Sequence, residues 1–447
     1  MVKLFGTDGI RGKAGEFPLD MDTVAKIGHA FSEVFTSRLG RPARFVSGRD
    51  TRESGPDIET AFHYGARLGD AEGESAGVIT TPGVAFITKE NRFDAGIVIS
   101  ASHNPYQDNG IKIFLPTGQK LDEESEREIE AIVSESVVTY TPKDSIRLGD
   151  KSMEFARDYF EYLRDKFAHL DLSRLKIAAD CANGAATSFA PELLRALGAD
   201  VAVINAEPNG RNINGNCGSL HLEHLQQAVL DNEADFGVAF DGDADRSLFV
   251  DEKGSVVDGD ATLWILANHL KKQRKLKSGQ VVATVMSNIG LETALRGEGI
   301  ELIRASVGDK YVLEELLRTG AEIGGEQSGH IILPKTSLVG DGMMTALFVL
   351  DALVNSGGTF SELHSGFIQS PQTLVNVRVK SKPEFDLVPV IAAAADKLRK
   401  QLGSDGRLLV RYSGTENLAR VMIEGKDQSE IERLAKSLAA VIEKEIG

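Results

Sequence analysis

The sequence predicts an α/β protein built of three similar α/β domains followed by a smaller α+β domain. Its 447 residues are enough for several domains, and 42% hydrophobic with 26% charged residues is typical of a globular protein. Helical patterns alternate with short apolar runs over most of the chain, which is typical of βαβ units. After Ser370-Pro371 this alternation changes, and the change predicts the fourth domain.

The first domain is expected to cover residues 1–147. Helical patterns and apolar runs alternate there at Met21–Leu39, Ala43–Val46, Ser54–Leu68 and Ala95–Ile99. The polar segment Thr139–Asp150 interrupts the alternation and predicts the boundary.

The second and third domains are expected at residues 148–254 and 255–369. The second has a helix after Gly184 and apolar runs at Leu175–Ala179, Asp200–Ile204 and Phe236–Phe240. The Gly/Asp-rich stretch Asp251–Asp260 separates it from a third set of strands and helices, Ala261 to about Phe367. The three units look like loose repeats, although no strict sequence period relates them.

The last domain, residues 370–447, follows the order strand, helix, strand, strand, helix. These elements are expected at Thr373–Val379, Phe385–Leu402, Arg407–Arg411, Ala419–Ile423 and Gln428–Glu445. Such a unit forms a small α+β domain of its own.

The composition excludes several classes of function. The formal charge is -16, from 66 acidic and 50 basic residues spread along the chain, so no nucleic-acid surface is expected. The two cysteines, Cys181 and Cys217, form no CxxC motif, which argues against a disulfide framework or a zinc site. No signal-like apolar region follows Met1, and the apolar stretch Met343–Val354 is too short to span a bilayer. We therefore expect a cytoplasmic protein without a membrane partner.

A serine stands just beyond the apolar run Ala95–Ile99, in Ser100-Ala101-Ser102-His103-Asn104-Pro105. Ligands of α/β sheets bind beyond the carboxyl ends of the strands, so Ser102 is well placed to act as a nucleophile or to carry a group. The alternative is a polar turn.

Three aspartates follow the third predicted strand of the second domain: Asp241, Asp243 and Asp245. In an extended segment their carboxylates would point to one side, where they could bind one hard cation such as Mg²⁺. With Glu252 they also match the acidic positions of a calcium EF-hand loop. Arg246 occupies the position of the required glycine, however, and strands flank the loop. A solvated acidic turn is the other alternative.

A glycine-rich segment, Gly324-Gly325-Glu326-Gln327-Ser328-Gly329-His330, follows a strand expected at Ala321-Glu322-Ile323. Glycines allow the backbone to approach a ligand closely, and Glu326 and Ser328 are suited to hold sugar hydroxyls. His330 could hold charge or move a proton. A plain turn is the alternative.

A hydroxyl-rich segment of the last domain, Arg411-Tyr412-Ser413-Gly414-Thr415, has Arg420 just downstream. Its backbone N–H groups, hydroxyls and guanidinium could cradle a phosphate, whereas the alternative is a hairpin with an exposed arginine. Arg11, in Gly9-Ile10-Arg11-Gly12, is a further candidate anion contact or a surface arginine.

These four motifs, in this order and over essentially the whole chain, resemble the α-D-phosphohexomutase family. They look like its phosphoserine loop (Ser102 to Pro105), metal loop (Asp241 to Arg246), sugar-recognition loop (Gly325 to His330) and phosphate-binding loop (Arg411 to Thr415). Further matching segments are Phe5 to Gly12, Ile99 to Ser102, Asp180 to Ala185 and Thr284 to Asn288.

The resemblance implies mixed-sheet domains around a central cleft and an enzyme that interconverts glucosamine 6-phosphate and glucosamine 1-phosphate. Such an enzyme would feed UDP-N-acetylglucosamine and cell-wall precursor synthesis, and glucose and mannose phosphates are the alternative substrates. The resemblance also implies a phosphorylated Ser102, one Mg²⁺ and a hexose 1,6-bisphosphate as intermediate and priming activator. The metal ligands would be Ser102, Asp241, Asp243 and Asp245. The substrate would be held by Glu326, Ser328, Arg411, Ser413, Gly414, Thr415 and Arg420. A monomer or a homodimer is expected.

By family analogy Lys112 is the first candidate for the base that takes the hydroxyl proton, since a lysine near other cations can have a lowered pKa. His330 is the second candidate, and a strand-surface lysine is the alternative for Lys112. Arg11 and Arg246 would steady the phosphates, and His103 would orient the loop of Ser102.

The chain departs from the family pattern at Ala244, Lys310 and Asn417, where glycine, arginine and proline are usual. None of these changes removes a ligand. A phosphatase or nucleotidyltransferase would leave Ser102 and the Arg411 loop without a role, and neither a P-loop nor a GxGxxG motif occurs. A non-enzymatic binder predicts loss of the nucleophile or of an aspartate, and all are present.

Overall fold

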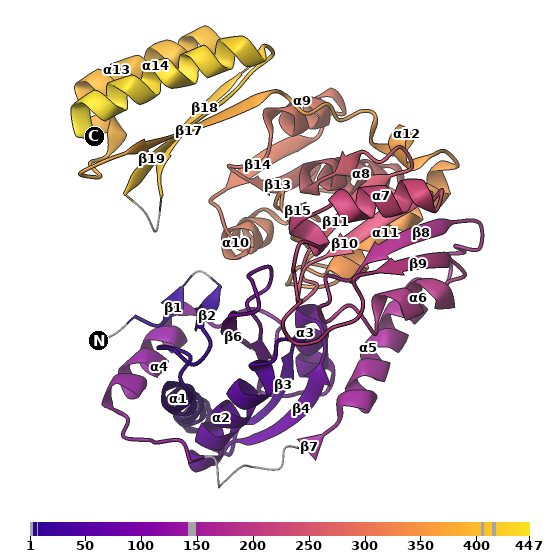
Figure 1. Ribbon diagram of the computed structural model, residues 1–447, viewed down its shortest axis with the longest axis vertical. Helices are drawn as coiled ribbons and strands as arrows, with labels where there is room; N and C mark the ends of the chain where they lie inside the picture. Colours follow the sequence, from indigo (N-terminus) through magenta and orange to yellow (C-terminus); the bar gives the residue numbers. More distant parts are fainter. Residues whose placement is uncertain (1–2, 7, 142–148, 404–405, 414–416) are drawn as a thin grey trace. The chain divides into compact units, whose positions relative to one another are not determined.

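The computed structural model describes residues 3–6, 8–141, 149–403, 406–413 and 417–447 (Figure 1). The chain divides into two compact units. One consists of residues 1–286 and 300–365, and the other of residues 287–299 and 366–447. The predicted boundary after residue 147 lies outside the described residues.

The first unit contains three mixed sheets. The seven-stranded sheet has the order β1 (Phe5–Gly6), β2 (Gly9–Lys13), β6 (Asp108–Phe114), β5 (Ala95–Ile99), β3 (Arg44–Arg49), β4 (Glu72–Val78), β7 (Gly149–Asp150). The five-stranded sheet has the order β12 (Val256–Val257), β11 (Ser247–Asp251), β10 (Phe236–Phe240), β8 (Lys176–Asp180), β9 (Asp200–Ile204). The four-stranded sheet has the order β14 (Glu301–Ala305), β13 (Gln280–Thr284), β15 (Gly324–Gly325), β16 (Ile331–Ile332).

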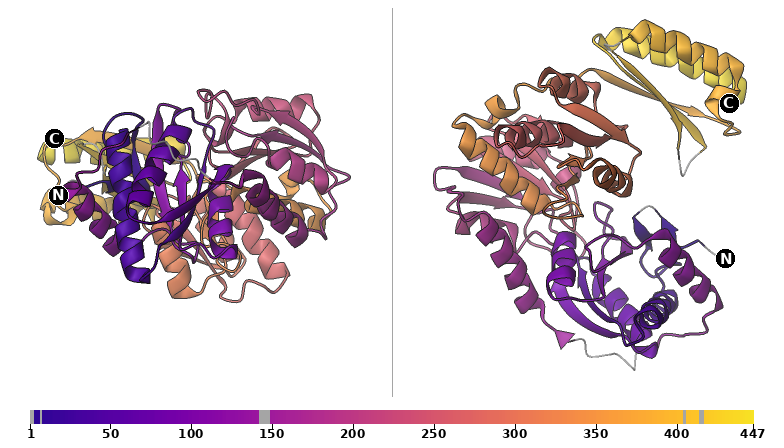
Figure 2. Two further views of the ribbon diagram at one scale, coloured as in Figure 1. Left: turned by 90° about the horizontal axis from the view of Figure 1, so that it is seen from below. Right: turned by 180° about the vertical axis from the view of Figure 1, so that it is seen from behind.

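The helices of this unit connect and cover the strands. They are α1 (Met21–Leu39), α2 (Gly55–Leu68), α3 (Thr81–Glu90), α4 (Glu123–Glu135), α5 (Ser152–Lys166), α6 (Ala190–Ala196), α7 (Glu223–Asp231), α8 (Gly259–Lys272), α10 (Asp309–Thr319), α11 (Gly342–Ser356) and α12 (Phe360–His364). A short 3₁₀ helix spans Gly218–Leu220. Helix α5 leads from the first sheet to the second and contacts β4 and α6 (Figure 2).

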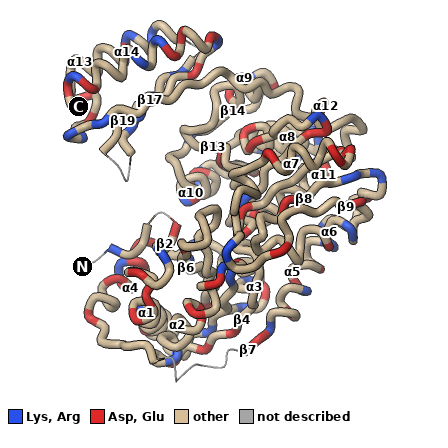
Figure 3. Tube along the Cα trace, viewed as in Figure 1, with Lys and Arg blue, Asp and Glu red and all other residues tan. Residues whose placement is uncertain are grey.

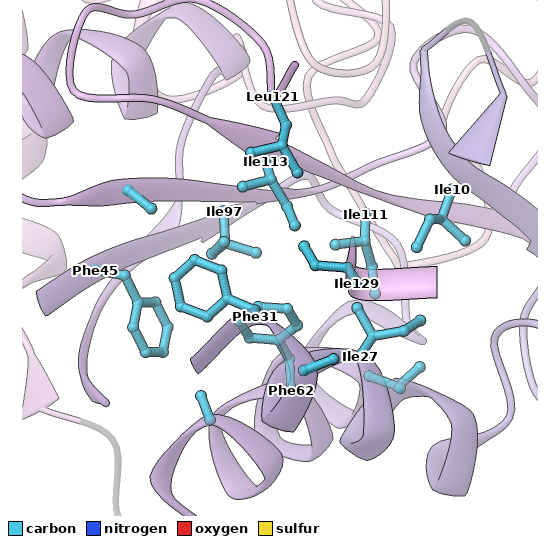
Figure 4. Close-up of a cluster of buried hydrophobic side chains, with 14 of the residues drawn as sticks. Ile10, Ile27, Phe31, Phe45, Phe62, Ile97, Ile111, Ile113, Leu121 and Ile129 are labelled. Carbon is cyan, nitrogen blue, oxygen red and sulfur yellow. The ribbon is translucent and has the colours of Figure 1, made fainter. Parts of the chain in front are cut away.

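The periodic segment Met21–Leu39 forms α1 with the predicted bounds. Its N-cap Asp20 accepts a hydrogen bond from the Thr23 backbone N–H, and Gly40 ends the helix in the left-handed conformation. The apolar face of α1 packs with α2 and α4 on the first sheet (Figure 4). Phe31 lies in this core 5.4 Å from the ring of Phe45 and 5.5 Å from that of Phe62. Such burial of large apolar side chains holds the strands that carry Ser102.

The second unit is a smaller α+β structure. Its antiparallel sheet has the order β17 (Gln372–Arg378), β19 (Leu418–Glu424), β18 (Arg407–Tyr412). Its helices are α9 (Ile289–Gly297), α13 (Pro389–Leu402) and α14 (Gln428–Ile446). Leu434, Leu438 and Ile442 of α14 join Val421 and Ile423 of β19 in its core. The predicted fold class, three mixed-sheet α/β parts and a smaller α+β part, is confirmed.

Two predicted elements differ from the structure. The helix expected at Phe385–Leu402 is divided into a 3₁₀ turn, Phe385–Leu387, and α13, which begins at Pro389. Proline has no N–H and disfavours helical geometry at the preceding residue, so Val388 is extended. The strand expected at Ala321–Ile323 is replaced by the two-residue β15 at Gly324–Gly325, inside the glycine-rich motif.

Candidate active site

Ser102 lies directly beyond β5, whose five residues are all buried. The Ser102 backbone has a φ of 51°, in the left-handed region, and its N–H donates to Ser100 Oγ at 2.9 Å. The side chain is buried, and its Oγ donates to Asp241 Oδ2 at 2.5 Å. The predicted nucleophile and the predicted metal loop are therefore in contact.

Two side chains that the sequence analysis did not single out hold the Ser102 loop. Arg52, which follows β3, is buried and donates to the carbonyl oxygens of Ser102 (3.1 Å) and Asn104 (2.6 Å). Asn214 donates to the same two carbonyls at 2.8 and 3.0 Å. The signal for Arg52 was its place beyond β3, because the carboxyl ends of parallel strands meet at one edge of the sheet.

The metal loop is a turn and not the extended segment that was predicted. Ala244 has a φ of 54°, which breaks the alternation of side chains along an extended chain. One carboxylate oxygen from each of Asp241, Asp243 and Asp245 nevertheless lies within 4.8 Å of the other two. Strands β10 and β11 flank the loop, which agrees with the rejection of an EF-hand. A Cβ on Gly242 would lie 2.6 Å from the Ser102 carbonyl oxygen, so the two loops meet at their backbones.

The three aspartates fit a divalent cation. All are buried, and burial followed by the nearby charges of Asp245 and Asp243 raises the pKa of Asp241 well above its ordinary value. Within the described residues, Asp243 Oδ1 and Asp245 Oδ1 are buried oxygens without a hydrogen-bond partner. Thr81, at the start of α3, donates to Asp243 Oδ2 at 2.5 Å. Clustered carboxylates with unpartnered oxygens are the donor set that hard cations bind.

Lys112 of β6 lies among these carboxylates. Its Nζ is 2.9 Å from Asp243 Oδ2, 3.4 Å from Asp245 Oδ2 and 3.5 Å from Asp8 Oδ2. Burial by itself would lower the pKa of Lys112, but the three carboxylates outweigh burial and raise the pKa above its ordinary value. The predicted lowering of this pKa is therefore wrong, because the three carboxylates outweigh the one nearby cation, Arg11. The side chain is only 1% exposed, so the alternative of a strand-surface lysine is also wrong.

A chain of charged groups leads from the N-terminal hairpin to α10. Asp8 forms ion pairs with both Arg11 and Lys120. Lys120 Nζ also lies 2.5 Å from Asp309 Oδ2, at the start of α10. Arg11 is thus oriented by Asp8, a role for Asp8 that sequence reasoning did not assign.

Two histidines lie beside the aspartates. His330 is buried, with Nδ1 3.7 Å from Asp245 Oδ2 and Nε2 3.6 Å from Asp309 Oδ2. Burial lowers its pKa, but these carboxylates raise it above the ordinary value. The Gly340 N–H donates to Nε2 at 3.1 Å, which places the proton of the neutral ring on Nδ1, facing Asp245.

His103 has the opposite electrostatic environment. Burial and the positive charges of Arg246 and Arg11 lower its pKa to about 4. Its Nδ1 lies 3.2 Å from Arg246 Nη1 and 3.4 Å from Ser102 Oγ. A neutral His103 between these two groups is suited to the orienting role that was predicted for it.

The sugar-recognition motif borders a cavity of about 590 Å³. Glu326 and His330 line it together with Arg11, Asp245, Arg246 and Asp309. The Gly308 N–H donates to Glu326 Oε1 at 3.1 Å, and Ser328 Oγ donates to Glu326 Oε2 at 3.4 Å. Arginines, carboxylates and a histidine around one cavity of this size suit a small, polar, anionic ligand.

The phosphate motif belongs to the second unit. Arg411 lies within β18 and not in a loop, directly opposite Arg420 of β19. Burial and the charge of Arg420 lower the pKa of Arg411. Ser413 is buried, and its Oγ lies 3.4 Å from Arg420 Nη2. The predicted contacts Gly414 and Thr415 lie outside the described residues.

Comparison with protein families accounts for nearly the whole chain. Family models described as phosphoglucomutase/phosphomannomutase alpha/beta/alpha domains I, II and III match residues 2–137, 157–254 and 258–370. The model of the C-terminal domain matches residues 374–441. The chain belongs to the phosphoglucomutase/phosphomannomutase family.

Relatives within this family match at full length. The phosphoglucosamine mutase of Solibacter usitatus is 48% identical over 447 residues, which cover 99% of each chain. That of Caldicellulosiruptor saccharolyticus is 47% identical over 448 residues, again 99% of each chain.

Solved structures of the phosphoglucomutase/phosphomannomutase family share the fold. A family protein from Burkholderia thailandensis superposes with a TM-score of 0.81 at 24% identity, over 99% of this chain and 98% of that one. The N-acetylphosphoglucosamine mutase of Aspergillus fumigatus, in complex with GlcNAc-6P and magnesium, gives a TM-score of 0.69 at 20% identity, over 99% of this chain and 96% of that one.

Among the described helices, none has the length and apolarity that crossing a membrane requires.

Proposed function

We propose that the chain is a phosphoglucosamine mutase, which interconverts glucosamine 6-phosphate and α-glucosamine 1-phosphate. The observation that carries the proposal is the hydrogen bond from Ser102 Oγ to Asp241, inside a buried cluster of three aspartates. The full-length relatives that bear this name support the choice of substrate. In this proposal residues 1–147 carry the phosphoserine, 148–254 the metal ligands, 255–369 the sugar contacts and 370–447 the phosphate contacts.

The metal is proposed to be one Mg²⁺, held by Asp241, Asp243, Asp245 and the group on Ser102. The unpartnered oxygens of Asp243 and Asp245 support this assignment. When bound, such an ion withdraws charge from the phosphoryl oxygens and lowers the barrier to transfer of the phosphoryl group.

The reaction proposed for Ser102 is a reversible phosphoryl transfer. The bond from phosphorus to Ser102 Oγ breaks, a bond to the free sugar hydroxyl forms, and the hydroxyl proton passes to a base. The product is a 1,6-bisphosphate. After this intermediate turns over, its other phosphate returns to Ser102, and the same bisphosphate would prime an unphosphorylated enzyme.

The sugar is proposed to bind in the cavity beside Glu326. The Glu326 carboxylate would accept hydrogen bonds from the sugar hydroxyls, and the Ser328 hydroxyl would donate to them. The Gly308 N–H fixes the Glu326 carboxylate. Arg11 and Arg246, which also line the cavity, would contact phosphoryl oxygens. Arg411, Ser413, Gly414, Thr415 and Arg420 would hold the phosphate that does not react.

The base is proposed to be Lys112 or His330. Lys112 remains an ammonium while three carboxylates surround it, so it can accept a proton only when positive charge offsets them. His330 is the other candidate for the base, and its Nδ1 faces the Asp245 carboxylate at 3.7 Å.

Intact-mass measurement of the purified protein tests the mutase proposal. Incubation with glucosamine 1,6-bisphosphate is expected to add the mass of one phosphate to the wild-type protein. The Ser102→Ala variant should not gain this mass, whereas the neighbouring Ser100→Ala variant should. A wild-type protein that never carries phosphate under these conditions would refute the proposal and favour a phosphatase or a binding protein.

The choice of substrate needs a separate experiment. We expect kcat/KM to be higher for glucosamine 1-phosphate than for glucose 1-phosphate or mannose 1-phosphate, because the three sugars differ at C2. A preference for glucose or mannose phosphate would overturn the glucosamine assignment and leave the mutase assignment intact.

A further inference from the structure

A second cavity of the first unit shares no lining residue with the cavity beside Glu326. Its volume is about 620 Å³, and it lies between the ends of α5 and α8, helix α11 and the segment after β16. Phe167, Leu270, Leu333 and Phe348 form its apolar part. The rings of Phe167 and Phe348 meet edge to face at 4.9 Å.

Four lysines line the same cavity: Lys166, Lys275, Lys277 and Lys335. Two of them belong to segment 271–277, Lys-Lys-Gln-Arg-Lys-Leu-Lys, in which five of seven residues are basic. Figure 3 shows acidic and basic residues interspersed over most of the chain, whose formal charge is -16. Segment 271–277 is therefore a basic block in a chain for which none was predicted. We call this space, with its four lysines and four apolar residues, the basic cavity.

The carboxylates of the basic cavity already have partners. Glu322 accepts from Ser278 Oγ at 2.7 Å and pairs with Lys335 at 3.1 Å. Asp351 lies 2.9 Å from His269 Nε2 and 3.2 Å from His169 Nε2. Lys166, Lys275 and Lys277, in contrast, form no ion pair within the described part of the chain.

Two of these lysines, Lys166 and Lys275, lie close enough for their charges to interact, and Lys166 Nζ also lies 5.7 Å from the centre of the Tyr162 ring. Burial and the charge of Lys275 lower the pKa of Lys166. Like charges gathered beside an apolar surface repel one another until an anion neutralises them. A purely inorganic anion would use the lysines and leave the aromatic wall unused.

We propose that the basic cavity binds a metabolite that carries an aromatic ring beside its phosphates, of the nucleoside diphosphate class. The ring packs against the half-buried Phe348, whose own ring rests on the buried Phe167, and the phosphates bind Lys166, Lys275 and Lys277. The volume of the cavity lies within the range of sites for ligands of this size.

Helix α11 connects the basic cavity with the metal loop. Phe348, Asp351 and Asn355 of α11 line the cavity. At the other end of this helix, the Gly342 N–H donates to the Ala244 carbonyl oxygen at 3.0 Å. Its N-cap Asp341 accepts from Tyr159 of α5 at 2.7 Å. A ligand that shifts α11 therefore acts on the loop that carries Asp243 and Asp245, and we expect it to change kcat.

Fluorescence titration of the full-length protein with methylanthraniloyl-ADP, at about 0.15 M salt, tests the proposal. We expect saturable binding that survives Ser102→Ala and saturating glucosamine 6-phosphate. Lys275→Glu/Lys277→Glu is expected to weaken it about 10- to 100-fold, because two charge-assisted contacts are reversed. Unlabelled ADP should compete, and pyrophosphate should compete at least about 10-fold less well.

The matched control is Lys272→Glu/Arg274→Glu, which reverses two charges of the same segment outside the cavity. It is expected to lose much less affinity than Lys275→Glu/Lys277→Glu, because neither Lys272 nor Arg274 lines the cavity. Absence of saturable binding, displacement by glucosamine 6-phosphate, equal competition by pyrophosphate or equal loss in both double variants would each overturn the proposal. An unchanged kcat at saturating ADP would overturn the coupling through α11. The binding readouts do not depend on the sugar substrate, whereas the kcat readout rests on the proposed mutase activity.

Discussion

The proposed reaction centre, Ser102 with Lys112 and the three aspartates, differs from the proposed phosphate site of the second unit, Arg411 with Ser413 and Arg420. In the reaction centre every one of these side chains is buried, and opposite charges lie within 4 Å of one another. In the phosphate site two arginines of like charge face each other across adjacent strands and are half-buried. Like charges directly opposite each other destabilise a sheet unless an anion lies between them.

This difference separates two tasks of one proposed reaction. The reaction centre orients its own groups before any ligand arrives, so a change there is expected to alter the transfer step. In the phosphate site Arg411 and Arg420 present like charges that a bound phosphate would offset, so a change there is expected to alter binding. Variants of the reaction centre should therefore change mainly kcat, and variants of the phosphate site mainly KM.

The largest effect is expected for Asp241→Asn. Loss of one buried carboxylate from the metal site should lower kcat on the order of 10³-fold or more. In EDTA the same variant should unfold at a higher temperature than the wild type, because it removes a buried charge that its neighbours repel. The two measurements are the mutase rate at saturating Mg²⁺ and thermal unfolding without metal.

Asp251→Asn is the matched control for this experiment. Asp251 is also a buried aspartate, at the far end of β11, and accepts backbone N–H bonds from Lys253 and Ser255. Its variant should keep kcat and lose stability. A metal-free Asp241→Asn protein that is less stable than the wild type would contradict the charge repulsion inferred for the reaction centre.

The next effect concerns the base of the reaction centre. Lys112→Gln is expected to lower kcat by about 10²- to 10⁴-fold, the usual contribution of a general acid or base. His330→Gln should cost less if Lys112 is the base. A larger loss in kcat for His330→Gln would assign the proton to His330 and leave Lys112 as a counter-charge for Asp243 and Asp245.

The phosphate site is expected to respond through KM. Arg411→Ala should lower kcat/KM about 10- to 100-fold with little change in kcat, since one charge-assisted contact to a phosphate is lost. Arg399→Ala is the control, because Arg399 is an exposed arginine of the same unit paired with Asp396. A fall in kcat at unchanged KM would place Arg411 in the transfer step and remove the contrast between the two sites.

The sequence predicted well what depends on local order. Helix α1 has the predicted bounds because its apolar period, the Asp20 cap and Gly40 all agree. Ser102, Asp241 and Glu326 could be singled out as candidates because each stands beyond a strand or in a glycine-rich turn, features that are visible in the sequence.

The sequence could not predict what depends on contacts between distant segments. Asn214 reaches the Ser102 carbonyl across 112 positions, and no local pattern marks it. The pKa of Lys112 was predicted in the wrong direction because its neighbours come from the N-terminal hairpin and from the metal loop, and only the fold brings them together. The metal loop was predicted as extended because an alternating pattern of residues does not reveal a positive φ.

The smallest effect tests how the reaction centre holds its metal loop. Ala244 has a φ of 54°, which costs a residue with a Cβ more than it costs glycine. Ala244 is also buried, so the higher chain entropy of glycine and the loss of a buried methyl group offset most of this gain, and Ala244→Gly should stabilise the protein by no more than about 0.5 kcal/mol. Ala239→Gly, in β10 just before the loop, should destabilise it by about 1–2 kcal/mol, because a buried methyl group is lost from a strand. Denaturant unfolding measures both changes. If Ala244→Gly is stabilised but its kcat falls, the strained alanine orients the aspartates; if kcat is unchanged, buried contacts such as Thr81 to Asp243 suffice to hold them.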